Sequence, residues 1–374
     1  MGGGEVNDLN AAHYLRQRGH DVTIVTASPM VGKARNLFDM YVVYLKTPWL
    51  YEYPYWLDKI NIKLAAALRH LDLYLFEWAV LRWLRRHREK FDIVQMCSLF
   101  HLLPGKLLTE FCWPCVSWLP GHPSGLTRRK IRSFVQYQNF AMFTHGEPEN
   151  SLLDMGFEKG REYEVIEAGI ELDVIDQVTV QSRAEERAES GFHESDLLGV
   201  TVARLIPIKN HAMLLEAIAL SREKGVIWNW IFAGGGHLLN HLKQRTLALG
   251  IENQVHWSGN IGRVDVYRLL RMADLFALTS IYENFSIAIL EAMAHRLPII
   301  GTRVGYLQRL IDDSGAGIVV PSGDARILAD TLVKMADLEI RNLYRGQGRT
   351  FVEQLNWPKI AEKLEELYLK LQKL

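Results

Sequence analysis

The sequence predicts an α/β protein of about two domains, the second of them doubly wound around a parallel sheet. In that half, short apolar runs begin at positions 197, 228, 254, 275, 298 and 317, and stretches with a helical apolar stripe separate them. Such alternation is typical of parallel strands covered by helices on both faces. The chain has 374 residues, 48% of them hydrophobic, which is enough for two cores.

Composition and charge exclude several classes of protein. The longest charge-free stretches, 111–127 and 225–242, contain Pro, Gly, Asn or His and do not predict spanning helices, and no signal peptide is visible. We therefore expect a cytoplasmic protein. The net charge is zero, but residues 1–140 hold 18 Lys and Arg against 11 Asp and Glu. The first half of the chain is therefore basic.

Taken in order, the first half predicts a glycine-rich turn, a helix and then a series of strands. The turn comprises residues 2–4, and the helical stripe after it ends at Gly19. Strands are predicted at 21–26, 41–45, 91–96, 115–118, 140–144 and 163–168. Residues 58–90 predict one or two helices, and their apolar face carries Leu64, Leu68, Leu71, Leu75 and Trp78.

Basic residues gather in two clusters, 82–90 and 128–132. A solvated helix face is the simplest interpretation of either cluster alone, because cations suit a helix C-terminus. Together with Trp83 and the basic balance of this half, they favour a peripheral contact with an anionic membrane. Such a contact would suit an acceptor carried on a lipid.

The sequence has three cysteines, and two of them form Cys112-Trp-Pro-Cys115. This spacing occurs in redox pairs, where it opens a helix after a strand. Here it follows a helix-like stretch and opens the strand predicted from Cys115. We therefore expect structural cysteines in a reducing compartment.

The stretch 275–305 carries two carboxylates, Glu283 and Glu291, around a predicted helix start. A buried strand at 275–279 runs into a loop that holds Glu283. The helix begins near Asn284 or Ser286, which places Glu291 about a turn and a half inside it. A strand, an acidic loop and a helix N-terminus at the carboxyl edge of a sheet predict a site for an anionic ligand, with a carboxylate available for hydroxyls.

The pattern E-x7-E followed by E-A-M-A-x-x-x-P-I-I-G-T resembles the retaining, nucleotide-sugar-dependent glycosyltransferases of the GT4 family. The resemblance implies the GT-B fold, in which two Rossmann-like domains face a cleft. It implies an acceptor-binding domain at 1–175, a donor-binding domain at 176–356 and a helix at 357–374 that crosses back to the first domain. The activity it implies is sugar transfer to an acceptor hydroxyl with retention of configuration, in polysaccharide or glycolipid synthesis.

The resemblance also implies roles for particular residues. Arg204 and Lys209, in a motif similar to G-R-L-x-x-x-K-G, would bind the donor diphosphate. Glu283 would hold sugar hydroxyls or the developing positive charge, and Glu291 the ribose hydroxyls. His122 is the nearest match to a functional histidine, with a solvated loop histidine as the alternative. The remaining donor-binding positions are Gly3, Gly4, Gly235, Asn284, Phe285, Ser286 and Ile287.

The chain departs from the family pattern in three places. Tyr306 and Arg309 stand where the family has a second glycine and an acid, which puts the sugar preference in doubt. Ala168 replaces the Asn before the hinge glycine, Gly169. A strand precedes the glycine turn in the family, whereas only Met1 does here. We expect that the recorded start lies downstream of the true one, the alternative being a domain without that central strand.

No phosphate-binding G-x-x-x-x-G-K loop, Asp-x-Asp pair or Cys/His metal spacing is present. We therefore expect no cofactor, metal-independent catalysis and no nucleic-acid partner. The expected partners are a nucleotide-sugar donor and a saccharide or lipid-linked acceptor. Two alternatives stay open. One is a sugar-nucleotide epimerase of similar architecture, and the other is a non-catalytic nucleotide-sugar-binding homologue.

Overall fold

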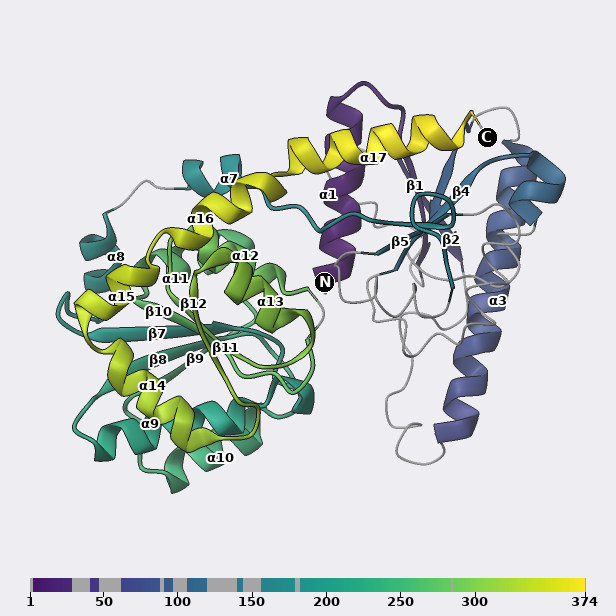
Figure 1. Cartoon of the computed structure of the whole chain (residues 1–374). Coiled ribbons are helices and arrows are strands. Elements are labelled where there is room, and N and C mark those ends of the chain that lie inside the picture. Colours follow the sequence, from purple (N-terminus) through teal and green to yellow (C-terminus); the bar gives the residue numbers. More distant parts are fainter. Residues whose placement is uncertain are drawn as a thin grey trace. The chain divides into compact units, whose positions relative to one another are not determined.

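The computed structural model describes residues 3–28, 41–46, 62–87, 91–96, 106–119, 140–143, 156–178, 182–283 and 285–373. The chain divides into two compact units, residues 1–169 with 357–374 and residues 170–356 (Figure 1). The division falls after Gly169 rather than after residue 175, because the Ile170 N–H donates to the Leu355 carbonyl at 2.8 Å. In the part of the chain that the structure describes, no helix is both long and apolar enough to cross a membrane.

The second unit is built on a six-stranded parallel sheet with the strand order β12-β11-β10-β7-β8-β9. Its strands are β7 (Leu197–Val202), β8 (Trp228–Ala233), β9 (Val255–Gly259), β10 (Leu275–Leu278), β11 (Ile299–Thr302) and β12 (Gly317–Val320). All six lie within about one residue of the predicted positions, so the doubly wound prediction is confirmed. The order reverses between β7 and β10, which pair in register through Leu275 and Gly199.

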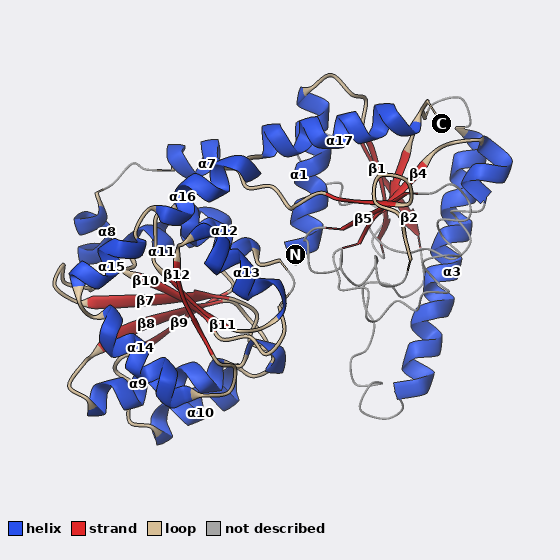
Figure 2. Ribbon diagram, viewed as in Figure 1, coloured by secondary structure: helices blue, strands red, loops and turns tan. Residues whose placement is uncertain are grey.

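Helices cover both faces of this sheet (Figure 2). One layer contains α9 (His211–Glu223), α10 (Leu239–Ala248) and α14 (Ala325–Met335). The other contains α8 (Arg183–Glu189), α11 (Arg263–Met272), α12 (Ile287–Ala294), α13 (Gly305–Ser314) and α16 (Gln347–Val352). The short elements are α7 (Leu172–Gln177), η3 (Pro207–Lys209), α15 (Leu338–Tyr344) and η4 (Glu353–Leu355). Trp228 and Trp230 are fully buried in the core between β8 and its covering helices.

A buried ion cluster fixes the amino edge of the sheet. Asp274, just before β10, accepts from Arg187 at 2.7 Å and from the Leu198 N–H at 3.0 Å, and Arg183 also pairs with it. Burial alone would raise the pKa of Asp274, but the Leu198 N–H and the two guanidinium groups outweigh it and hold the pKa below its usual range. This cluster ties α8 to β7 and β10 at the end opposite the candidate site.

Two smaller parallel sheets are seen in the described residues of the first unit. One pairs β1 (Thr23–Ser28) with β2 (Tyr41–Lys46), and the other has the order β3 (Val94–Met96), β4 (Cys115–Leu119), β5 (Phe140–Phe143), β6 (Tyr163–Val165). The described helices are α1 (Gly3–Gln17), α3 (Ile62–Arg86), the π-helical turn η1 (Leu107–Phe111) and α17 (Trp357–Leu371). The expectation about a strand before the glycine-rich start falls outside the described residues and stays a prediction.

Helix α17 packs against α1 within the first unit. The rings of Tyr14 and Trp357 stack at 5.8 Å, and Glu365 accepts hydrogen bonds from Arg18 and His20, the latter at 2.8 Å. A Cβ on Gly169 would lie 2.5 Å from the Trp357 ring, so a glycine is needed there by close packing.

Of the apolar face predicted for 58–90, the part whose side chains are described faces solvent. Leu71, Leu75 and Trp78 share one side of α3 and are 54%, 43% and 56% exposed. The opposite side is buried and carries Val80, Leu81 and Leu84, together with the acids Asp72 and Glu77. Periodicity predicted which residues share a face, and the tertiary structure decided which face is covered.

The Cys112–Cys115 pair is not arranged as a redox site. Both thiols are free, Cys112 is exposed with a φ of +55°, and Cys115 opens β4. Burial raises the pKa of the Cys115 thiol far above its usual range, which disfavours the reactive thiolate. These features agree with a structural role.

Candidate functional site

The candidate site lies at the carboxyl ends of β7 and β10, where the strand order reverses. Lys209 follows β7 and Glu283 follows β10, and the two side chains form an ion pair although they are 74 residues apart. The Ser280 hydroxyl donates to the Glu283 carboxylate at 3.0 Å. Parallel α/β sheets bind ligands at such switch points, because the loops on either side of it diverge.

Hydrogen bonds join the two loops that carry this pair. The Ile281 N–H donates to the Ile208 carbonyl at 2.9 Å, and the Thr279 hydroxyl donates to the Asn210 carbonyl at 3.1 Å. Thr302, at the end of β11, donates to the Ser280 carbonyl at 2.5 Å. Lys209 and Glu283 are therefore held on a fixed backbone.

The N-terminus of α12 lies next to this loop and has no side-chain cap from its N-cap residue, although the Ile289 N–H donates to the Ser286 carbonyl at 3.1 Å. Ser286 is the N-cap residue and is buried, but its side chain makes no capping hydrogen bond, so the first-turn N–H groups are not used by it. Ile287 is the first helical residue. The Phe285 ring stacks on Tyr306 at 5.7 Å. A helix N-terminus in this state can bind an anion.

Arg204 lies beyond the end of β7 with its side chain exposed. Its carbonyl lies 3.0 Å from Nε2 of the buried His211. Burial lowers the pKa of His211, a backbone hydrogen bond to Arg204 opposes this, and nearby Lys209 lowers it further. A neutral His211 that donates from Nε2 would therefore position the Arg204 backbone. His211 follows the Lys209 motif directly, so its place in the sequence was visible but its role was not predicted.

The glycines after β8 are required by close contacts inside the unit. A Cβ on Gly235 would lie 2.6 Å from the Asn260 amide, and one on Gly236 would lie 2.2 Å from the Leu205 carbonyl oxygen. Gly234 has a φ of +138°. Packing against the loops after β7 and β9 therefore explains these glycines, and the approach of a nucleotide to Gly235 stays a prediction.

Glu291, in the second turn of α12, belongs to a buried cluster that the sequence did not predict. Its carboxylate lies 3.7 Å from Nε of Arg263, which also pairs with Glu171 and lies over the Tyr267 ring. Glu291 is only 8% exposed. Burial raises its pKa to about 7; Arg263 lowers the pKa and Glu171 raises it. Arg263 thus favours the ionised form of Glu291.

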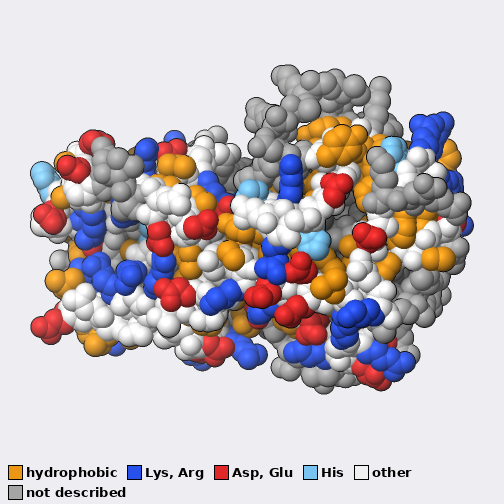
Figure 3. Space-filling model, turned by 90° about the horizontal axis from the view of Figure 1, so that it is seen from above, with side chains coloured by type: hydrophobic (Ala, Val, Ile, Leu, Met, Phe, Trp, Pro, Cys, Tyr) orange, Lys and Arg blue, Asp and Glu red, His pale blue; other side chains and the backbone are white. Residues whose placement is uncertain are grey.

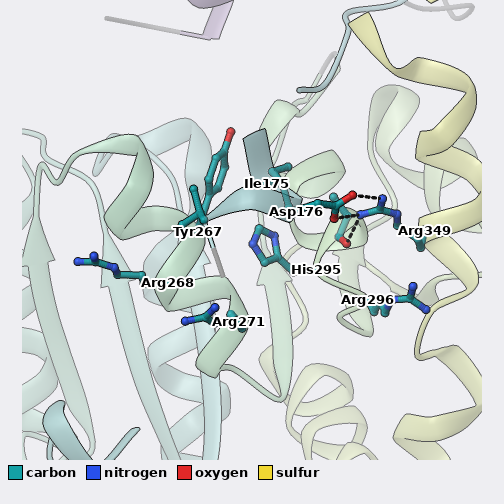
Figure 4. A pocket seen from close by; sticks show the side chains of 10 residues that line it. Ile175, Asp176, Tyr267, Arg268, Arg271, His295, Arg296 and Arg349 are labelled. Carbon is teal, nitrogen blue, oxygen red and sulfur yellow. Dashed lines mark hydrogen bonds and ion pairs between the residues drawn. The ribbon is translucent and has the colours of Figure 1, made fainter. Parts of the chain in front are cut away.

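A second feature near these helices is a pocket of about 430 Å³ at the C-terminal end of α12 (Figure 4). His295 lies at its centre, between Tyr267 and the ion pair of Asp176 and Arg349. Four arginines line it, namely Arg268, Arg271, Arg296 and Arg349. Arg268 and Arg271 extend to the side of His295 opposite Arg296 and Arg349.

The structure brings together part of the predicted set. Lys209, Glu283, Phe285, Ser286 and Ile287 come from two adjacent loops and the start of α12. Arg204 and Gly235 lie at the same carboxyl edge, since the Leu205 N–H donates to the Gly235 carbonyl at 2.9 Å. The predicted residues His122 and Asn284 lie outside the described residues.

Two predicted glycines differ from expectation. Gly3 and Gly4 were expected in a turn before the first helix, but they form the first turn of α1. The turn prediction was wrong at these positions because helical backbone can begin at glycine as well as after it. A contact with phosphate stays a prediction for them.

Tyr306 and Arg309 lie next to the loop after β10. Tyr306 is buried against Phe285, and Arg309 pairs with Asp313 at 3.2 Å and lies over the Tyr306 ring. The two departures from the family pattern therefore form one group beside the predicted donor-binding residues. The described residues contain no cluster of three or more His, Cys, Asp or Glu suited to a metal ion.

A doubly wound sheet with a lysine, a carboxylate and an open helix N-terminus at its switch point defines a nucleotide-binding α/β protein. Residues 182–367 match the family of glycosyl transferases group 1. The chain therefore belongs to the group 1 glycosyltransferases, as the sequence motifs predicted.

Relatives and solved structures agree with this assignment. A UDP-Gal:alpha-D-GlcNAc-diphosphoundecaprenol alpha-1,3-galactosyltransferase of Escherichia coli is 25% identical over 75% of this chain and 76% of its own length. A D-inositol 3-phosphate glycosyltransferase of Saccharomonospora viridis is 29% identical over 50% of this chain, and the match spans 46% of that relative. Anabaena HepE in complex with UDP-glucose has a TM-score of 0.74 and 17% identity, with 99% of this chain and 96% of that chain covered. The predicted GT-B fold is confirmed.

Proposed function

We propose that this protein transfers a sugar from a nucleoside-diphosphate sugar to an acceptor hydroxyl, without a metal ion and with retention of the anomeric configuration. The observation that carries the proposal is the Lys209–Glu283 pair at the switch point, beside the open N-terminus of α12. Cations and free N–H groups there suit a diphosphate, and a carboxylate suits the sugar. No metal is needed if these groups neutralise the leaving diphosphate.

Catalysis requires interactions that strengthen as the bond to the diphosphate breaks. Negative charge then grows on the diphosphate, and Lys209, Arg204 and the first-turn N–H groups of α12 would stabilise it. Positive charge grows on the sugar at the same time. Glu283, which is held by Ser280 and Lys209, would stabilise that charge or bind the sugar hydroxyls.

The nucleoside would be held through its ribose. An ionised Glu291 accepts hydrogen bonds only, so it suits a pair of ribose hydroxyls. Gly235 lies at the same edge of the sheet, where its backbone would contact the nucleotide. A uridine nucleotide is favoured because HepE was crystallised with UDP and UDP-glucose and the E. coli relative is named for UDP-Gal.

The acceptor is assigned to the first unit, with His122 as its candidate catalytic contact. Gly3 and Gly4 stay predicted contacts of the donor phosphate. A saccharide or lipid-linked acceptor is favoured because the E. coli relative acts on a diphosphoundecaprenol-linked sugar, according to its name. Such an acceptor would bring the protein to the cytoplasmic face of a membrane. The basic clusters 82–90 and 128–132 support a peripheral contact with anionic lipid there.

The first experiment is a thermal-shift panel of UDP, GDP, ADP and CMP on the chain, on Glu291→Ala and on Glu339→Ala. Glu339 is an exposed acid on α15 and serves as the matched control. One nucleotide should raise the melting temperature of the wild type and the control but not of Glu291→Ala. Equal shifts in both variants would refute the ribose role of Glu291. No shift with any nucleotide would contradict the donor site.

Two further measurements separate the alternatives. Transfer in the presence of EDTA tests metal independence, and the anomeric configuration of the product, read by NMR, tests retention. A sugar-nucleotide epimerase would convert the donor without any acceptor, whereas a transferase needs one. A non-catalytic homologue would bind the nucleotide but show neither reaction.

A further inference from the structure

The solvent face of α3 is a stripe of large hydrophobic side chains. Leu71, Tyr74, Leu75 and Trp78 are all exposed, and their spacing of three and four residues places them on one side of the helix. In the second unit, by contrast, Leu247 on α10 and Ile327 on α14 are exposed singly, and the exposed Leu338 and Leu343 of α15 lie five residues apart, on different sides of that helix. Single exposed hydrophobic residues are ordinary, but a contiguous group marks an interaction surface.

Cations continue the same face toward the end of the helix. Arg82, Arg85 and Arg86 are exposed, one to two turns after Trp78, and the Arg82 guanidinium lies 5.9 Å from the centre of the Trp78 ring. Arg85 donates to Glu110 at 2.9 Å, which leaves Arg82 and Arg86 as the outward charges of this turn.

Acidic side chains are absent from this face of the helix. The only acids of α3 are Asp72 and Glu77, and both are buried on its other side. On the face of the second unit seen in Figure 3, acidic and basic side chains are interspersed instead. The exposed face of α3 is therefore apolar at one end, cationic at the other and free of carboxylates from its own helix.

We infer that this face of α3 lies in the surface of an anionic lipid bilayer. The four hydrophobic side chains would enter the boundary between headgroups and acyl chains, and Arg82 and Arg86 would contact lipid phosphates. A second copy of the chain fits less well, because a parallel pair of such faces brings arginines toward arginines and an antiparallel pair places arginines over hydrophobic side chains, without a carboxylate of α3 in either case. The inference rests on the membrane contact proposed above and assigns it to one helix face.

Insertion by this face differs from attraction by basic residues alone. A purely electrostatic contact is weakened by salt and is insensitive to the loss of hydrophobic side chains. An inserted stripe depends on the hydrophobic side chains as well, because their burial in lipid supplies part of the binding free energy. Substitution of Leu75 and Trp78 therefore separates the two.

The test is co-sedimentation of the full chain with vesicles of phosphatidylglycerol and phosphatidylcholine, and with phosphatidylcholine alone. The variant is Leu75→Ser with Trp78→Ser, and the matched control is Leu247→Ser with Leu343→Ser, which removes two exposed hydrophobic side chains from the second unit. We expect binding to the anionic vesicles only. The α3 variant should lower the partition coefficient at least tenfold, and the control should stay within twofold of the wild type.

Arg82→Glu should also lower binding, whereas Arg268→Glu, an exposed arginine of α11, should not. An unchanged partition coefficient in the α3 variant would overturn the inference. So would a concentration-dependent dimer in sedimentation velocity that Trp78→Ser abolishes, because a second copy would then cover the face. The UDP thermal shift on the same samples reports the donor site independently, so its absence would contradict the proposed function without affecting the vesicle result.

Discussion

The two ends of α12 carry similar charged groups but differ in how those groups are used. At the N-terminus, Ser286 makes no capping hydrogen bond, and Lys209 and Glu283 lie in the adjoining loops. At the C-terminus, His295 Nδ1 lies 2.8 Å from the Glu291 carbonyl, and Arg349 donates to the Ala294 carbonyl at 3.2 Å. The Ser286 side chain caps no N–H group at the first end, whereas side chains already donate to the carbonyls at the second.

The pairing of three of its four arginines argues against an anion site in the pocket at the C-terminal end. Arg349 forms two hydrogen bonds to Asp176, and Arg271 pairs with Glu186. Arg268 pairs with Asp265. Helix C-termini also favour cations over anions. A count of arginines around a cavity therefore does not by itself identify a binding site, because the partners of each arginine have to be considered.

Removal of Lys209, beside the N-terminal end of α12, should have the largest effect on catalysis. Lys209→Ala is expected to lower kcat/KM by about 10²–10³-fold, because one stabilising group for the leaving diphosphate is lost. Lys224→Ala, which removes a surface lysine paired with Asp330, is the matched control and should be nearly neutral. A fall of less than threefold in Lys209→Ala would remove the lysine from the site.

Removal of Arg349, at the C-terminal end of α12, should lower the stability of the protein and leave nucleotide binding unchanged. Arg349→Ala is expected to lower the free energy of unfolding by about 1–2 kcal/mol, because an α12 carbonyl and Asp176 lose their partner, with part of the loss screened by solvent. Urea unfolding measures this, with Arg309→Ala as the exposed control. Nucleotide affinity should not change. A variant with normal stability and weaker nucleotide binding would make the pocket part of the site.

Glu291 connects the two ends, and its substitution should have an intermediate effect. Glu291→Gln keeps the shape of the side chain but replaces one accepting oxygen by a donor. We expect the dissociation constant for UDP-glucose to rise by about tenfold, measured by calorimetry at pH 8. Glu339→Gln should leave it unchanged. Equal affinity in wild type and Glu291→Gln would show that the ribose is held elsewhere.

The smallest expected effect is a pH dependence that Arg263 controls. Because the pKa of Glu291 is about 7, the affinity for UDP-glucose should rise between pH 6 and pH 8 as the carboxylate forms. Glu291→Gln should abolish this rise, and Arg263→Gln should move its midpoint to higher pH. A midpoint that stays in place in Arg263→Gln would contradict the assigned contact.

The same pKa has a consequence for folding. It lies above the value of about 4.3 expected for an unfolded chain, so the folded state favours the neutral carboxyl. The free energy of unfolding therefore receives a full contribution from a neutral Glu291 below about pH 4.3. This contribution is lost as the pH rises through the folded-state pKa of about 7. Glu291→Gln should remove this component of the pH dependence of unfolding.

Local sequence predicted the open end of α12 well. The strand before Glu283, the helix start at Ser286 and the position of Glu291 one and a half turns later follow from short-range periodicity and capping. Asp324 likewise precedes an apolar helical stripe in the sequence and, as the N-cap of α14, accepts from the Arg326 and Ile327 N–H groups. The alternation of six strand patterns with helical patterns along the chain allowed a parallel sheet to be predicted before any contact was known.

Contacts between distant segments could not be predicted in this way. Glu283 pairs with Lys209 across 74 residues because β7 and β10 are neighbours at the switch point. Arg263, which pairs with Glu171 and faces Glu291, has no sequence motif of its own. Such groups are identified only when the fold places their side chains within a few ångströms of each other.

The sequence by itself determined the family, the doubly wound second unit and the residue types at its switch point, because each is encoded in contiguous motifs. Only the tertiary structure decided that Arg349 donates to a carbonyl at the C-terminal end of α12. It also decided that the apolar side of α3 that carries Leu71, Leu75 and Trp78 is exposed. The physical reason is that periodicity assigns residues to a face of a helix, whereas burial depends on which other elements pack there.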